Sequence, residues 1–132
     1  MVAQIFVFFC HNHGESVKHL FFECAFSYAV WQGCLEWMGV VAALPNSCVS
    51  HFLLVESWGW RKSKRGAWSC IWLACVWNIW LQRNLIAFQG IQPSVDKVID
   101  GIKAHSWFWA NNLGKAMAIS FLDWSREFIN CC

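Results

Sequence analysis

Cysteine and histidine residues are concentrated near the start of this 132-residue sequence, in the segment CHNHGESVKHLFFEC. These residue types bind zinc, which prefers four cysteine or histidine ligands arranged as a tetrahedron. Gly14 supplies a turn, and Ser16 can cap a short helix that carries His19 and Cys24. With Cys10 these two residues provide three ligands, so the segment predicts a structural zinc site.

A second group of residues that could bind a ligand is the basic run WRKSKRG, which contains Arg61, Lys62, Lys64 and Arg65. The run predicts a loop over residues 59–66. Four positive charges so close together are suited to phosphate groups, but they also occur beside membrane segments and in solvated loops. The run is therefore a candidate RNA or DNA contact, with the solvated loop as the alternative.

Catalytic groups of the common kinds are not gathered in this sequence. A polymerase needs clustered aspartates to hold two magnesium ions, whereas Asp96, Asp100 and Asp123 stand alone on amphipathic segments. The sequence also lacks a nucleophile elbow, a phosphate-binding loop and an HExxH motif. We therefore expect a protein that is not an enzyme.

The element that must position these groups is a long apolar helix predicted over residues 68–88. Its apolar side chains fall on two faces, so we expect both faces to need partners. The first face carries Trp68, Trp72, Cys75, Val76 and Ile79, and the second carries Trp77, Trp80, Leu81 and Phe88. The continuous apolar run is shorter than the ~20 residues of a membrane span. The pattern thus favours a core helix, with Trp72 and Trp80 in the core, and a membrane anchor through residues 67–88 is the less favoured alternative.

Further helices are indicated on either side of the central helix. Helical spacing continues from Cys24 to Gly39, and a Pro45 to Ser47 turn precedes a short helix around residues 51–56. An amphipathic helix follows from Ser94 to Asn112, and a last helix is expected over about residues 115–128. Since alternating strand patterns are confined to a short piece at residues 4–9, the predicted fold is mainly α.

Composition bounds the organisation of the chain. A length of 132 residues suits one domain, which we divide into a metal-site segment at 1–24, N-terminally truncated, and a helical remainder at 25–132. Hydrophobic residues form 58% of the chain and charged residues 14%, so we expect a partner to cover apolar surface.

The cysteines are expected to be reduced, because the N-terminus does not resemble a signal peptide and disulfide frameworks belong to secreted proteins. We therefore expect an intracellular location, in the nucleus or the cytoplasm. Cys34, Cys48, Cys70 and Cys75 lie in apolar runs and are predicted to be buried.

Several motifs follow one another along the chain: HLFFEC, VW followed by WMG, an Arg-Asn pair within the Trp-rich helix, and VIDGIK followed by WFW. This series resembles the zinc-binding domain at the C-terminal end of plant non-LTR (LINE-type) retrotransposon reverse transcriptase polyproteins. The resemblance covers nearly the whole chain and includes the tail FLDWSREFINCC. Its residues are Cys10, His19, Leu20, Phe21, Phe22, Cys24, Val30, Trp31, Trp37, Gly39, Trp72, Trp77, Trp80, Arg83, Asn84, Phe88, Val98, Ile99, Ile102, Lys103, Trp107 and Trp109.

The resemblance implies a zinc-dependent nucleic-acid-binding accessory to reverse transcription that lacks the polymerase itself. Such domains place their first ligand three residues before the second, where this chain has Val7. A shifted set of Cys10, His13, His19 and Cys24 is an alternative, and we expect a degenerate zinc site. The chain is then a stand-alone remnant of a retrotransposon polyprotein, with a helical protein-interaction module that needs neither metal nor nucleic acid as the alternative function.

Overall fold

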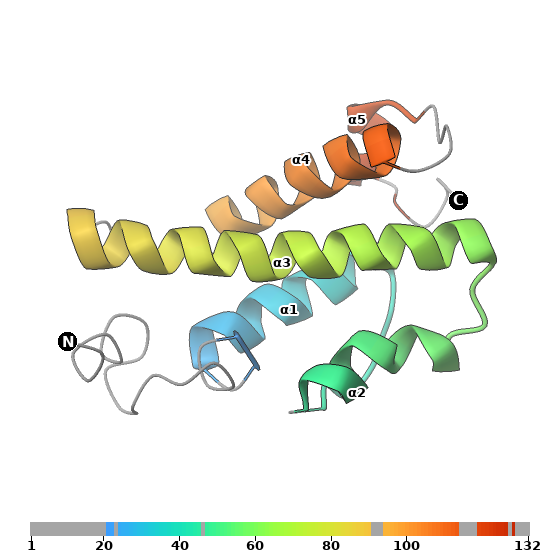
Figure 1. Cartoon of the computed structure of the whole chain (residues 1–132), viewed down its shortest axis with the longest axis horizontal. Coiled ribbons are helices and arrows are strands. Elements are labelled where there is room, and N and C mark those ends of the chain that lie inside the picture. Colours follow the sequence, from blue (N-terminus) through green and yellow to red (C-terminus); the bar gives the residue numbers. More distant parts are fainter. Residues whose placement is uncertain are drawn as a thin grey trace.

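The computed structural model describes residues 21–22, 24–45, 47–90, 94–113, 119–126 and 128. These residues are mainly helical and contain no strand, which confirms the predicted fold class. The other helices are arranged around one long central helix (Figure 1). In chain order the elements are α1 (Ala25–Met38), α2 (Cys48–Phe52), the 3-10 helix η3 (Leu53–Ser57), α3 (Lys62–Gln89), α4 (Val95–Leu113) and α5 (Phe121–Arg126).

The first helices begin and end where their terminal residues predict. Gly39 ends α1 in a left-handed conformation at φ 73°, and its N–H donates to the Glu36 carbonyl. A glycine is favoured there because a side chain at positive φ is strained. The Ser47 hydroxyl accepts a hydrogen bond from the Ser50 N–H at the start of α2. The predicted short helix around residues 51–56 is therefore present as α2 and η3.

Helix α3 is longer than predicted, with 28 residues from Lys62 to Gln89. The predicted loop over residues 59–66 is wrong, because the helix already begins within the basic run. Lysine and arginine are strong helix formers, so the helix can extend through them. Gly90 ends it at φ 65°.

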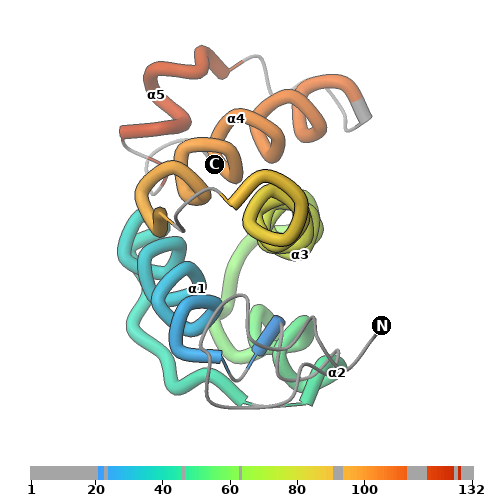
Figure 2. Tube along the Cα trace, turned by 90° about the vertical axis from the view of Figure 1, so that its left-hand side faces the viewer, coloured from blue at the N-terminus to red at the C-terminus, as the bar shows by residue number. Residues whose placement is uncertain are grey.

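One side of α3 is not covered by the other described helices. In the end-on view of Figure 2, α1 lies to the left of α3, α4 and α5 lie above it and α2 lies below it. Trp68, Cys75 and Ile79 are fully buried on the covered side, whereas Trp80 and Phe88 are exposed. The prediction that Trp80 belongs to the core is therefore wrong.

Helix α4 packs closely against α3 and α1 through the face that its periodicity predicts. Val98 and Ile102 are buried on this face. Gly101 allows the Asn78 side chain of α3 to approach the α4 backbone, since a Cβ atom there would overlap the Asn78 amide oxygen. A small residue at this point sets the separation of the two helices.

The last helix is shorter than predicted, because Ile119 and Ser120 are not helical and α5 begins at Phe121. The Ser120 hydroxyl accepts a hydrogen bond from the Asp123 N–H and so marks the true start. Trp124 of α5 is fully buried and its indole N–H donates to the Ser106 hydroxyl at 3.1 Å.

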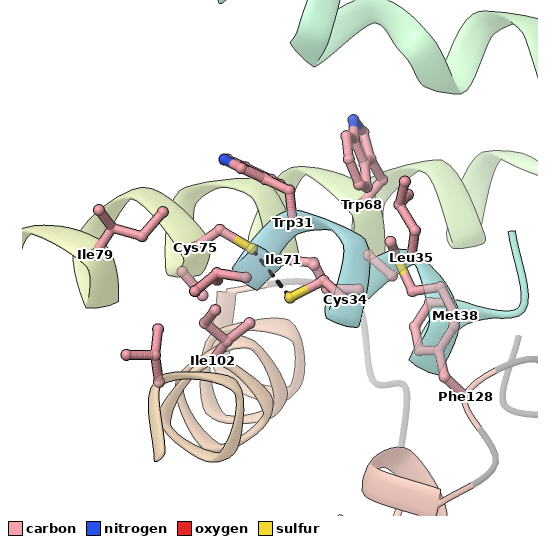
Figure 3. Packing of buried hydrophobic residues seen from close by; sticks show 14 of the residues in the cluster. Trp31, Cys34, Leu35, Met38, Trp68, Ile71, Cys75, Ile79, Ile102 and Phe128 are labelled. Atoms are coloured by element: carbon pink, nitrogen blue, oxygen red, sulfur yellow. Dashed lines mark hydrogen bonds between the residues drawn. The ribbon is translucent and has the colours of Figure 1, made fainter. Parts of the chain in front are cut away.

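The core at the crossing of α1, α3 and α4 contains a buried thiol pair, Cys34 and Cys75, whose sulfur atoms lie 3.5 Å apart (Figure 3). Both carry free thiols. The burial predicted for these two residues is confirmed, but Cys48 is exposed on α2 and Cys70 is only half-buried. None of the helices in the described part of the chain combines the length and apolarity needed to cross a bilayer.

Candidate functional site

The four basic residues singled out in the sequence are brought together at the N-terminal turn of α3, which we call the basic turn (Arg61, Lys62, Lys64 and Arg65). Arg61 is the N-cap residue, with an extended backbone at φ −64° and ψ 160°, and Lys62 opens the helix. Both side chains are exposed. The Arg65 guanidinium forms an exposed ion pair with Glu56 at 2.5 Å.

The basic turn lies at the positive end of a long helix dipole. The first four N–H groups of a helix have no partner within the helix, and together they act as roughly half a positive charge. Arg61 makes no side-chain cap, and the first turn of α3 contains no acidic residue that would neutralise it. Helix end and side chains therefore attract anions together, and phosphate groups are the usual anions bound in this way.

Aromatic side chains beside the basic turn are engaged with one another and with Lys64. The Lys64 ammonium lies 4.8 Å from the Trp60 ring centre and 5.8 Å from that of Phe128. The Trp58 ring contacts both Trp60 and Trp68, with ring centres 4.9 Å apart in each pair. Because these contacts occupy the rings, the geometry favours contact with a phosphate backbone over stacking of bases.

A second polar feature, which the sequence reasoning missed, is His51 inside an aromatic cage. His51 is 1% exposed, and its ring centre lies 4.2 Å from that of Trp31 and 4.9 Å from that of Phe22. The Trp72 indole N–H donates to His51 Nδ1 at 3.0 Å, which places the proton of the neutral ring on Nε2. In the sequence the only sign of this site was a histidine in an otherwise apolar helix, because its hydrogen-bond partner Trp72 is 21 residues further along the chain.

Burial lowers the pKa of His51 from 6.5 to about 4. Charging a group inside an apolar cage is unfavourable, because the protein replaces water with weakly polar neighbours. Nε2 has no hydrogen-bond partner among the described residues, and the rings of Phe22 and Trp31 lie against the imidazole ring. The ring is therefore neutral near pH 7 and has a structural role.

The predicted zinc ligands are divided between the described residues and the rest of the chain. Cys24 is fully buried at the N-cap of α1. Cys10, His13 and His19 lie outside the described residues, and the described part of the chain holds no group of three or more side chains that could bind a metal.

Of the two polar features described above, the basic turn is the one that a macromolecule can reach, because His51 is enclosed. Its charge and its helix end select for anions but do not by themselves select a sequence or a partner. No protein-family model, curated protein or solved structure matches the chain.

Proposed function

We propose that this chain is a non-catalytic nucleic-acid-binding domain derived from the zinc-binding domain of a LINE-type retrotransposon reverse transcriptase. The observation that carries the proposal is the basic turn of α3, where four positive side chains meet a helix N-terminus whose first turn contains no acidic residue, although Glu56 pairs with Arg65. A phosphodiester backbone is the ligand whose repeated negative charge suits a surface with several positive side chains.

Within the basic turn the four side chains have different roles. Arg61 and Lys62 are exposed and reach outward, so they make the direct phosphate contacts. Lys64 is held over Trp60, which fixes its charge beside the helix end. Arg65 can exchange Glu56 for a phosphate at little cost, because an exposed ion pair contributes only ~0–1 kcal/mol.

Zinc enters this proposal through the family resemblance. Cys24 with Cys10, His13 and His19 would hold the ion, which in such a site supplies folding energy rather than chemistry. With Val7 at the family's first-ligand position, we propose weak zinc binding and a fold that rests on its Trp-rich helices. Native mass spectrometry of chain expressed with zinc tests this point, and a stoichiometric ion that survives mild chelation would contradict it.

The salt dependence of RNA binding tests the proposed function. For single strands each neutralised phosphate contributes about −0.7 to the slope of log K against log salt concentration. The Arg61→Ala/Lys62→Ala variant should therefore flatten the slope by about 1.4. The Lys97→Ala/Arg126→Ala variant is the matched control, because it removes the same charge from exposed positions on α4 and α5. Equal slopes for the two variants would refute a role for the basic turn.

A helical protein-interaction module is the second candidate function. It is supported by the exposed apolar side chains on α3, which include Trp77, Trp80 and Phe88. Loss of binding to a protein but not to RNA on substitution of these residues would favour this candidate over the first.

A further inference from the structure

The face of α3 that no described helix covers carries an apolar outer stripe, which we define as Leu73, Trp77, Trp80 and Phe88. Their exposed fractions are 54%, 45%, 40% and 81%. The spacing of these residues follows the helical repeat, so they share one side of α3, opposite the buried Ile71 and Cys75. Such a stripe is typical of a helix that packs on another helix.

A hollow adjoins one end of the outer stripe. It has a volume of about 400 Å³, lies between α2 and α3, and has walls that include Val49, Phe52, Leu53, Trp72 and Leu73. Its lining is apolar. The same face therefore carries a hollow near Leu73 and, at the other end of the stripe, the strongly exposed ring of Phe88.

We infer that the outer stripe is the interface of a homodimer, in which the α3 helices of two copies pack antiparallel and each Phe88 enters the hollow of the other copy. Leu73 and Phe88 are 15 residues apart, about 22 Å along the helix. A twofold axis across α3 near Trp80 places Phe88 of one copy beside Leu73 of the other, and the reverse. One rotation thus fills both hollows, as a self-complementary interface requires.

Charge favours the antiparallel arrangement over the parallel one. Parallel packing would set the two basic turns side by side, with eight positive side chains close together. Antiparallel packing about the same axis separates the turns by about 50 Å, far beyond the ~10 Å screening length of 0.1 M salt. Repulsion between the two basic turns is then negligible.

The available area is sufficient for a dimer of moderate affinity. The three aromatic side chains of the outer stripe expose about 250–400 Å² in each copy, on the basis of ~150–250 Å² for a whole ring. With Leu73, Val49 and Leu53, two copies bury about 1,000 Å² in total, which is about the minimum expected of a biological interface. The Arg83 guanidinium lies 5.1 Å from the Trp80 ring centre and holds this ring in place before association.

Light scattering after size-exclusion chromatography tests the dimer on the full chain. We expect a mass of twice 15.3 kDa for the wild type. Phe88→Ser should weaken association at least ~30-fold, as loss of an aromatic ring that fills a pocket of the partner does. The matched control is Phe108→Ser, which removes an equally large ring that is 55% exposed on α4 and should leave the dimer intact.

A wild type that is monomeric at ~100 µM, or a dimer that Phe88→Ser leaves unchanged, would overturn the inference. Circular dichroism of Phe88→Ser should match the wild type, because the replaced ring is exposed.

Disulfide mapping tests the direction of packing. An Ala87→Cys substitution, which lies on the same side of α3 as Leu73 and Trp80, should cross-link to the exposed Cys48 of the other copy, because Cys48 lines the hollow. A cross-link between the two introduced thiols would show parallel packing and contradict the antiparallel arrangement.

Discussion

Acidification should destabilise the fold through His51, whose ring lies in the cage of Phe22, Trp31 and Trp72. In the folded chain burial lowers the pKa of His51 from 6.5 to about 4. The unfolded chain therefore binds a proton at a higher pH than the folded chain does. The stability that the neutral His51 ring contributes is fully present above about pH 6.5 and is lost progressively as the pH falls towards 4.

The size of the effect follows from the two pKa values. One pKa unit corresponds to about 1.36 kcal/mol, so the loss at pH 4.5 is about 2.5 kcal/mol. Because His51 is 1% exposed, solvent does not screen this cost. A loss of this size is a large part of the stability of an ordinary domain, which is about 5–15 kcal/mol.

Urea unfolding followed by tryptophan fluorescence at a series of pH values measures this loss. His51→Gln is the matched variant, because its amide oxygen can accept the Trp72 N–H and it does not titrate. Wild type should lose stability between pH 6.5 and 4.5 while the variant changes little over the same range. Parallel pH profiles for the two proteins would refute the reasoning.

Three further predictions follow from the burial of particular residues. Trp68→Ala should lower the free energy of unfolding by ~3–5 kcal/mol, whereas Trp80→Ala should lower it by ~1 kcal/mol or less in the monomer. Equal losses for the two variants in urea unfolding would contradict the one-sided burial of α3. Gly101→Ala should lower the free energy of unfolding by ~1–3 kcal/mol although alanine has the better helix propensity, because the new methyl group displaces the Asn78 amide. A rise in melting temperature would contradict this close packing of α3 and α4. Iodoacetamide should modify Cys48 in the native protein and spare the buried thiol pair, since burial and the contact with Cys34 raise the pKa of the Cys75 thiol. Mass spectrometry showing early modification of that pair would contradict the core.

The fold could be predicted from local signals wherever a helix has one apolar face and a clear end. Gly39 and Ser47 are such signals, and α1, α2 and α4 lie where these and the apolar spacing place them. The start of α5 was predicted too early, because the capping role of Ser120 is visible only once the Asp123 N–H is seen to bond to it.

The two-sided helix α3 shows where such reasoning stops. Periodicity identifies two apolar faces, but which face is buried depends on where the other helices bring their own apolar residues. Trp72 and Trp80 read alike in sequence, yet the first bonds to His51 and the second is exposed. The sequence correctly predicted that the four basic residues lie close together, but it wrongly placed them in a loop. The helix continues through them because lysine and arginine have high helix propensity.

The most direct test of the proposed function is an amide-resolved NMR titration of the full chain with a single-stranded oligouridylate at low salt. The basic turn should give the largest chemical-shift changes, at residues 61–66, and these changes should fade as salt is added because phosphate contacts release counterions. Shift changes confined to the outer stripe, or none at low salt, would contradict nucleic-acid binding through the N-terminal turn of α3.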